Sequence, residues 1–173
     1  HYKGGQAVAG LFKKILPEGG KIAVIMSSHN LSCHQDRLRG FSDKLAAYFP
    51  KLKIVEVQEN QDRKDEAFRI TLETLNNYPD LNAIYITSGG VAGVGHALEI
   101  AGRVSRVKVI CHDIIPDSIE LLKKGIIDFA IGQDPELQGY LLVKTLFDFL
   151  IKKTKPKQKI LDVPIDIVTE DTI

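Results

Sequence analysis

Five short segments rich in β-branched and apolar residues recur along the chain, and segments of helical length separate them. Strands that are apolar on both faces are typical of a buried parallel sheet. Parallel neighbours need a crossover connection, which a helix on one face of the sheet or the other supplies. The sequence therefore predicts an α/β fold, a doubly wound parallel five-stranded sheet with helices on both faces. The five expected strands are Ile22–Met26, Lys53–Val57, Ala83–Ile86, Val107–Cys111 and Phe129–Ile131.

Capping and turn residues mark where several helices begin. Ser32 and Gln35 have the spacing of a capping box. Pro116 and Pro135 stand where a first-turn proline belongs, and Asp134 precedes the second of them as an expected N-cap. These signals support the alternation of strands and helices.

The chain of 173 residues is about one domain in length. It opens with a helix-like stretch at residues 5–15 and closes with a strand-like one at residues 163–168. We therefore expect residues 1–173 to be a single lobe of a larger protein, with residues 152–173 as a connector and terminal strand.

Charge and cysteine content argue against some classes of protein. The 23 Lys and Arg residues nearly balance the 22 Asp and Glu residues, whereas nucleic-acid binding favours a strongly basic chain. Cys33 and Cys111 are too few for a disulfide framework, which favours reduced thiols and the cytoplasm. There is also no apolar run long enough to predict a membrane span or a signal peptide.

Polar residues follow the expected strands at the edge where parallel α/β sheets bind ligands. Ser88 follows the third strand, Asp113 the fourth and Gln133 the fifth, and Arg37 lies on the helix after the first. Such fixed donors and acceptors suit the hydroxyls of a small polar ligand. The sequence predicts a ligand-binding site here.

Enzyme and metal motifs are weaker. Cys33 and Arg39 have the cysteine-x5-arginine spacing of phosphatases, but no glycine lies between them and Asp36 would oppose an anion. His29, Cys33 and His34 are zinc ligands by type, yet no second cluster completes a tetrahedral set. We expect no catalytic residue, no metal and no cofactor.

Four motifs together resemble the second half of the type I periplasmic-binding-protein fold, and the resemblance covers essentially the whole chain. This fold is shared by effector domains of lactose-repressor-type (LacI) transcription regulators and by sugar-binding proteins of ABC transporters. The motifs are Arg37–Phe41, Thr87–Ala92, Val109–Asp113 and Ile131–Asp134.

The resemblance implies that Arg37, Ser88, Asp113 and Gln133 contact a sugar. Two departures from the pattern concern the ligand, because Ser88-Gly89 replaces the usual Asn-Asp and no aromatic precedes the helix after the second strand. The resemblance also implies a second, N-terminal lobe that closes on the ligand.

Two functions share this fold. The unpaired cysteines, with Cys111-His112 beside the expected ligand aspartate, favour the regulator: a cytoplasmic, non-enzymatic allosteric sensor of carbohydrate that forms a homodimer and contacts DNA through a helix-turn-helix absent from this chain. The alternative is a periplasmic or extracellular sugar-binding receptor of an ABC transporter, and a cysteine-dependent phosphatase is a distant third.

Overall fold

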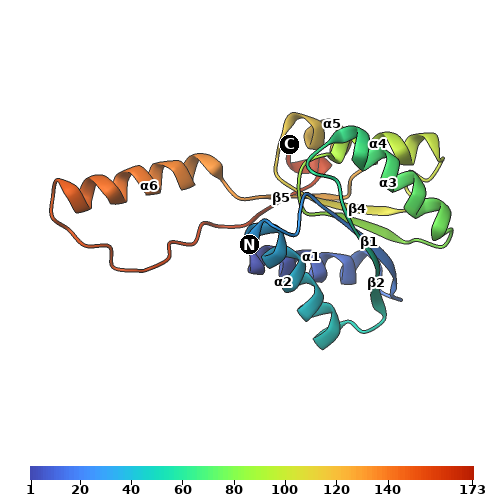
Figure 1. Ribbon diagram of the computed structural model, residues 1–173, viewed down its shortest axis with the longest axis horizontal. Helices are drawn as coiled ribbons and strands as arrows, with labels where there is room; N and C mark the ends of the chain where they lie inside the picture. Colours follow the sequence, from blue (N-terminus) through green and yellow to red (C-terminus); the bar gives the residue numbers. More distant parts are fainter.

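A computed structural model describes residues 1–173, in which one six-stranded sheet is flanked by helices (Figure 1). The strands are ordered β2-β1-β3-β4-β5-β6, and the first five are parallel. The strands are β1 (Gly20–Met26), β2 (Leu52–Glu59), β3 (Ala83–Ile86), β4 (Lys108–His112), β5 (Phe129–Gly132) and β6 (Asp166–Val168). The helices are α1 (Tyr2–Ile15), α2 (Ser32–Tyr48), α3 (Lys64–Asn77), α4 (Val91–Ile100), α5 (Pro116–Lys123), α6 (Pro135–Leu150) and a final 3-10 turn η1 (Glu170–Thr172).

The predicted α/β class and parallel sheet are confirmed, but the sheet has a sixth strand. β6 pairs antiparallel with β5, Ile131 lying opposite Ile167. The sequence predicts a terminal strand at residues 163–168 but not its place in the sheet, because the pairing is only three residues long and the strand is largely exposed. An antiparallel edge strand needs no crossover helix, and α6, which lies between β5 and β6 in the chain, does not cover the sheet.

Helices cover both faces of the sheet. Figure 1 shows α1 and α2 on one face and α3, α4 and α5 on the other. Phe12, Phe41 and Tyr85 belong to the core on the α1–α2 side, and their rings are in contact. The core on the other face is aliphatic and includes Ile84 and Leu98. These two cores fix the strand ends that carry the polar residues.

Glycines allow α1 and α2 to pack backbone against backbone. A Cβ added to Gly5 would lie 2.0 Å from the carbonyl oxygen of Arg37, and one added to Gly40 would lie 2.0 Å from that of Tyr2. Real Cβ atoms do not approach backbone oxygens so closely. The close contact therefore fixes the turn of α2 that carries Arg37.

We expect Gly40→Ala to destabilise the fold, because the new methyl group forces α1 and α2 apart. The overpacking cost is about 1–3 kcal/mol, which exceeds the gain in helix propensity from alanine. Urea denaturation measures it. The matched control is Gly139→Ala in α6, where an added Cβ meets nothing within 4 Å and stability should stay unchanged or rise slightly. Equal effects at the two glycines would contradict the close-packing argument.

α6 projects from the body of the fold as an arm (Figure 1). It starts at Asp134, whose side chain accepts a 2.8 Å hydrogen bond from the backbone N–H of Leu137, as the predicted N-cap requires. No residue of α6 is buried. Residues 151–165 return from its far end to β6, and together with α6 we call them the arm (residues 135–165). None of the helices, α6 included, is both long and apolar enough to cross a membrane.

Candidate functional site

The predicted ligand residues lie at the carboxyl ends of the parallel strands. Arg37 reaches this edge from α2, and its guanidinium is almost fully buried. Its Nη1 donates to the carbonyl oxygen of Thr87 after β3, and its Nη2 lies 3.8 Å from Oδ1 of Asp113 after β4. The buried cation is thus held by a backbone carbonyl and a carboxylate, and it joins the ends of two strands.

Asp113 and Gln133 are also brought together. Nε2 of Gln133 donates to Oδ1 of Asp113 over 2.9 Å. Asp113 has a left-handed backbone with φ of 74°, which is uncommon for a residue other than glycine and recurs at functional sites. Its side chain stays 46% exposed, so the second carboxylate oxygen is open to a ligand. Arg37, Asp113 and Gln133 form one connected polar wall.

Ser88 is buried beside this wall but bonds elsewhere. Its hydroxyl lies 3.4 Å from Oδ1 of Asn60, which is fully buried, and 3.4 Å from the carbonyl oxygen of Gly89. Asn60 also donates to that carbonyl over 2.7 Å, and Asp62 accepts a 2.9 Å hydrogen bond from the N–H of Gly89. Asn60 and Asp62 therefore shape the loop that carries Ser88. Sequence reasoning missed both as site residues, although Asp62 lies in the stretch before α3 where the resembled family often has an aromatic.

Two histidines are buried close to Arg37. His112 is 2% exposed, and its Nε2 lies 2.8 Å from the hydroxyl of Tyr85. Burial, and next the Arg37 charge, hold the pKa of His112 well below its ordinary value of 6.5. The same two causes lower the pKa of His34, which is less deeply buried. Both imidazoles are therefore neutral at neutral pH.

The lowered pKa of His112 predicts that folding stability falls with acidification. Below about pH 6.5 the unfolded chain binds a proton that the folded chain does not bind. The free energy of unfolding therefore falls by up to about 1.4 kcal/mol per pH unit until the pH reaches the pKa of His112 in the folded chain. Urea unfolding at pH 7.5 and 5.5 measures the loss. His112→Leu should reduce it, whereas His96→Gln, at an exposed position of α4, should leave it unchanged. An unchanged pH slope in His112→Leu would contradict this assignment.

Four buried polar atoms near this edge of the sheet have no hydrogen-bond partner. Buried side-chain atoms usually have one, and an unpaired one costs free energy. Ordered ligands or waters satisfy such groups in binding sites. The four are Nδ1 of His34, Nε of Arg37, Oγ1 of Thr87 and Nδ1 of His112.

The structure does not arrange residues for the alternative phosphatase and metal sites. Cys33 and Arg39 lie in the continuous helix α2, not in an anion-binding loop, and Arg39 pairs with Asp36 over 2.9 Å. No group of three or more His, Cys, Asp or Glu side chains is arranged to hold a metal ion. Cys111 is fully buried, and burial raises its pKa to about 12, so its thiol is unreactive.

Comparison with known proteins identifies the class. Residues 1–154 match the family described as Periplasmic binding protein domain, and the chain belongs to this family. It is 27% identical over 170 residues to the D-ribose/D-allose-binding protein of Pseudomonas aeruginosa, covering 96% of this chain and 53% of that protein. The chain spans about half the length of the curated relatives it matches.

Solved structures agree with this family. GanP, a glucose-galactose binding protein from Geobacillus stearothermophilus, aligns with a TM-score of 0.91 at 25% identity, over 98% of this chain and 60% of its own. AraP, an arabinose binding protein from the same organism, aligns with a TM-score of 0.86 at 29% identity, over 98% of this chain and 61% of its own. The expected membership of the type I periplasmic-binding-protein superfamily is confirmed.

The regulator interpretation is wrong. The relatives are named as sugar-binding proteins, several of them for import, and not as LacI-type transcription regulators. The predictions that depended on this interpretation are therefore wrong as well: the homodimeric regulator, its helix-turn-helix contact with DNA and its cytoplasmic location. The cysteine argument failed because Cys111 is a core side chain, packed with Ile84 and Ala130, whose burial says nothing of the compartment.

Proposed function

We propose that this chain is one lobe of a sugar-binding receptor that delivers a pentose or hexose to an ABC importer, and that it is not an enzyme. The observation that carries the proposal is the connected wall of Arg37, Asp113 and Gln133 at the ligand-binding edge of the sheet. The names of the relatives, which include ribose-, allose- and fructose-binding proteins, support it.

Four residues would contact the sugar from this lobe. Asp113 accepts from hydroxyls through its open carboxylate oxygen, and Gln133 and Ser88 add neutral polar contacts. Arg37 donates from its guanidinium, which lies beside Asp113. A carboxylate beside a guanidinium suits adjacent hydroxyls, since one accepts and the other donates.

The arm supports a two-lobed receptor. Its large apolar side chains are exposed, although soluble monomers rarely expose large contiguous apolar patches. The half of the relatives that this chain does not span would cover them, so that the ligand is bound between this lobe and that one. The exposed side chains are Tyr140, Leu142, Val143, Leu146, Phe147, Phe149, Leu150, Ile151, Ile160, Leu161 and Ile165.

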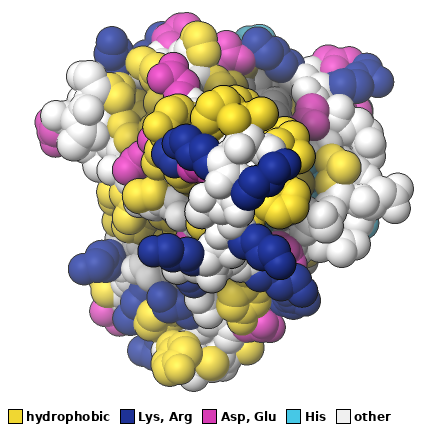
Figure 2. All heavy atoms as spheres, turned by 90° about the vertical axis from the view of Figure 1, so that its left-hand side faces the viewer, with side chains coloured by type: hydrophobic (Ala, Val, Ile, Leu, Met, Phe, Trp, Pro, Cys, Tyr) yellow, Lys and Arg dark blue, Asp and Glu magenta, His cyan; other side chains and the backbone are white.

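The surface composition of the arm is consistent with an interface to a second lobe. Figure 2 shows hydrophobic side chains there together with several Lys and Arg residues. Leu142, Leu146, Phe149 and Leu161 help line a groove of about 650 Å³ between α6 and the returning segment. The basic residues fit the solvated end of the arm, where residues 152–159 contain five lysines.

A receptor of this kind works outside the cytoplasm, in the periplasm or at the cell surface. This follows from the transport role, and one relative is named the D-allose-binding periplasmic protein of Escherichia coli. Its partners are then the sugar, the second lobe and the permease of the importer.

Calorimetric titration of the full-length protein tests the proposal. The panel is ribose, allose, xylose, arabinose, fructose, glucose and galactose. We expect micromolar or tighter binding of at least one member, as a receptor that captures dilute sugar requires. Binding of none of them would overturn the proposed function.

A further inference from the structure

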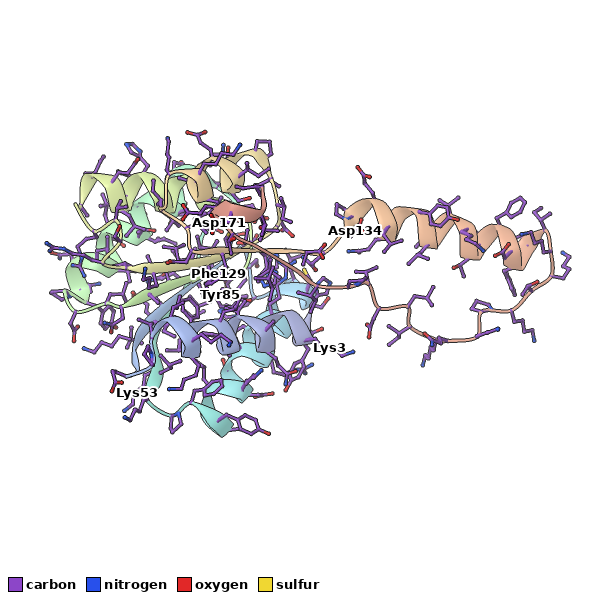
Figure 3. The ribbon with its side chains drawn as sticks, turned by 180° about the vertical axis from the view of Figure 1, so that it is seen from behind. Lys3, Lys53, Tyr85, Phe129, Asp134 and Asp171 are labelled. Carbon is purple, nitrogen blue, oxygen red and sulfur yellow. The ribbon has the colours of Figure 1, made fainter.

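His112 is a buried polar residue at the ligand-binding edge that the proposed sugar contacts do not use. It ends β4 directly before Asp113, and its ring contacts that of Tyr85, the centroids being 5.7 Å apart. Tyr85 projects from β3 into the core between the sheet and the helices α1 and α2, where Figure 3 labels it. Gly4 of α1 covers the ring, since a Cβ added there would lie 3.1 Å from Cε1 of His112.

The Tyr85 contact determines which ring nitrogen of His112 carries the proton. The Tyr85 hydroxyl is fully buried, and Nε2 of His112 is its hydrogen-bond partner at 2.8 Å. If Nε2 carried the proton, two buried groups would be unpaired, namely the hydroxyl hydrogen of Tyr85 and the lone pair of Nδ1, whereas a proton on Nδ1 leaves only Nδ1–H unpaired. Tyr85 therefore donates to Nε2, and the neutral ring carries its proton on Nδ1.

Nδ1–H of His112 is then a buried donor without an acceptor. The ring helps line a cavity of about 660 Å³, and Gln133 of the proposed sugar-binding wall lines the same cavity. The cavity also borders the start of α1 and residues 160–165. No protein atom pairs the buried Nδ1–H, and the cavity is the space beside the ring in which a bound ligand would lie.

We propose that His112 is a further ligand-recognising residue, whose Nδ1–H donates to an oxygen of the bound sugar, and that Tyr85 is the positioning residue that keeps the proton on Nδ1. This rests on the proposed function. The site then selects for a sugar with an oxygen at that place, because a sugar that lacks it leaves the donor unpaired.

Two matched substitutions in the full-length protein test the donor. His112→Asn keeps an N–H donor at the position of Nδ1, and His112→Leu has none. Both leave Tyr85 without its partner, so the two variants share that cost and differ in the donor. With the tightest-binding sugar of the panel, we expect the Leu variant to bind about 10-fold more weakly than the Asn variant.

The outcomes separate this proposal from the proposed function. If the unmodified protein binds a panel sugar and the Asn and Leu variants bind it equally, His112 is not a donor to the ligand, although the receptor function stands. If the unmodified protein binds none of the sugars, the receptor function fails and this inference fails with it.

Imidazole nitrogen NMR of the unmodified protein tests the tautomer without a variant. We expect Nδ1 of His112 to be protonated without sugar and its signal to shift when the panel sugar is added. In Tyr85→Phe the proton should move at least partly to Nε2, a change that a merely structural tyrosine would not produce. An Nε2-protonated ring in the unmodified protein, or an Nδ1 signal indifferent to sugar, would overturn the proposal.

Discussion

Asp113→Ala in the full-length protein is expected to weaken sugar binding by on the order of 10- to 100-fold, since each charge-assisted hydrogen bond contributes about 1.5–3 kcal/mol. The carboxylate has one oxygen engaged by Arg37 and Gln133 and the other free for the ligand. Removing it also leaves the buried Arg37 guanidinium without its counter-charge. Arg37→Ala should weaken binding comparably, because it removes the donor and releases Asp113.

Calorimetric titration with the tightest-binding panel sugar measures both effects. The matched control is Asp117→Ala, which removes a carboxylate on the first turn of α5 that pairs with Lys64 over 2.7 Å. It should leave the dissociation constant unchanged. Full affinity in Asp113→Ala would show that the wall of Arg37, Asp113 and Gln133 does not bind the sugar.

The isolated chain of residues 1–173 is expected to bind no monosaccharide more tightly than about millimolar. Its wall is open on one side, and a solvent-exposed hydrogen bond nets only about 0.5–1.5 kcal/mol. Immobilising a ligand costs several kcal/mol, which a few such bonds hardly offset. The full-length protein, in which a second lobe would exclude water, should bind far more tightly.

Titration of the isolated chain beside the full-length protein checks this expectation, with circular dichroism to verify folding. The exposed side chains of the arm favour self-association, so the sample is kept dilute and its size is followed by gel filtration. A micromolar dissociation constant for a monomeric isolated chain would mean that the site is complete within one lobe.

The parallel sheet was predictable because its strands are buried on both faces. The strand at Ala83–Ile86 has the predicted bounds, and the one predicted at Lys53–Val57 extends to Leu52–Glu59. The strand-like stretch that contains β6 was not assigned to the sheet, because two of the three residues of β6 are exposed and no local pattern records its pairing with β5. The direction of α6 was equally hidden, since its apolar composition is that of a core helix although none of its residues is buried.

The candidate site was predictable only where a strand end fixes a side chain. Arg37, Asp113 and Gln133 meet because the carboxyl ends of parallel strands share one edge. The roles of Asn60, Asp62 and Tyr85 depend on contacts between segments distant in the chain, which no local pattern records. Regulators and receptors share this lobe, so its residues alone did not separate the two functions.

The arm leaves the sheet after β5 and returns to the neighbouring β6, which orders the assembly of the fold. β6 pairs with β5 only after the whole excursion of residues 133–165 has closed, and closing a long loop carries an entropic cost. The five parallel strands have no such delay, because each follows its own crossover helix. β6 is therefore the last strand to join and the first to detach, and its backbone amides should exchange with solvent before those of β3 or β4.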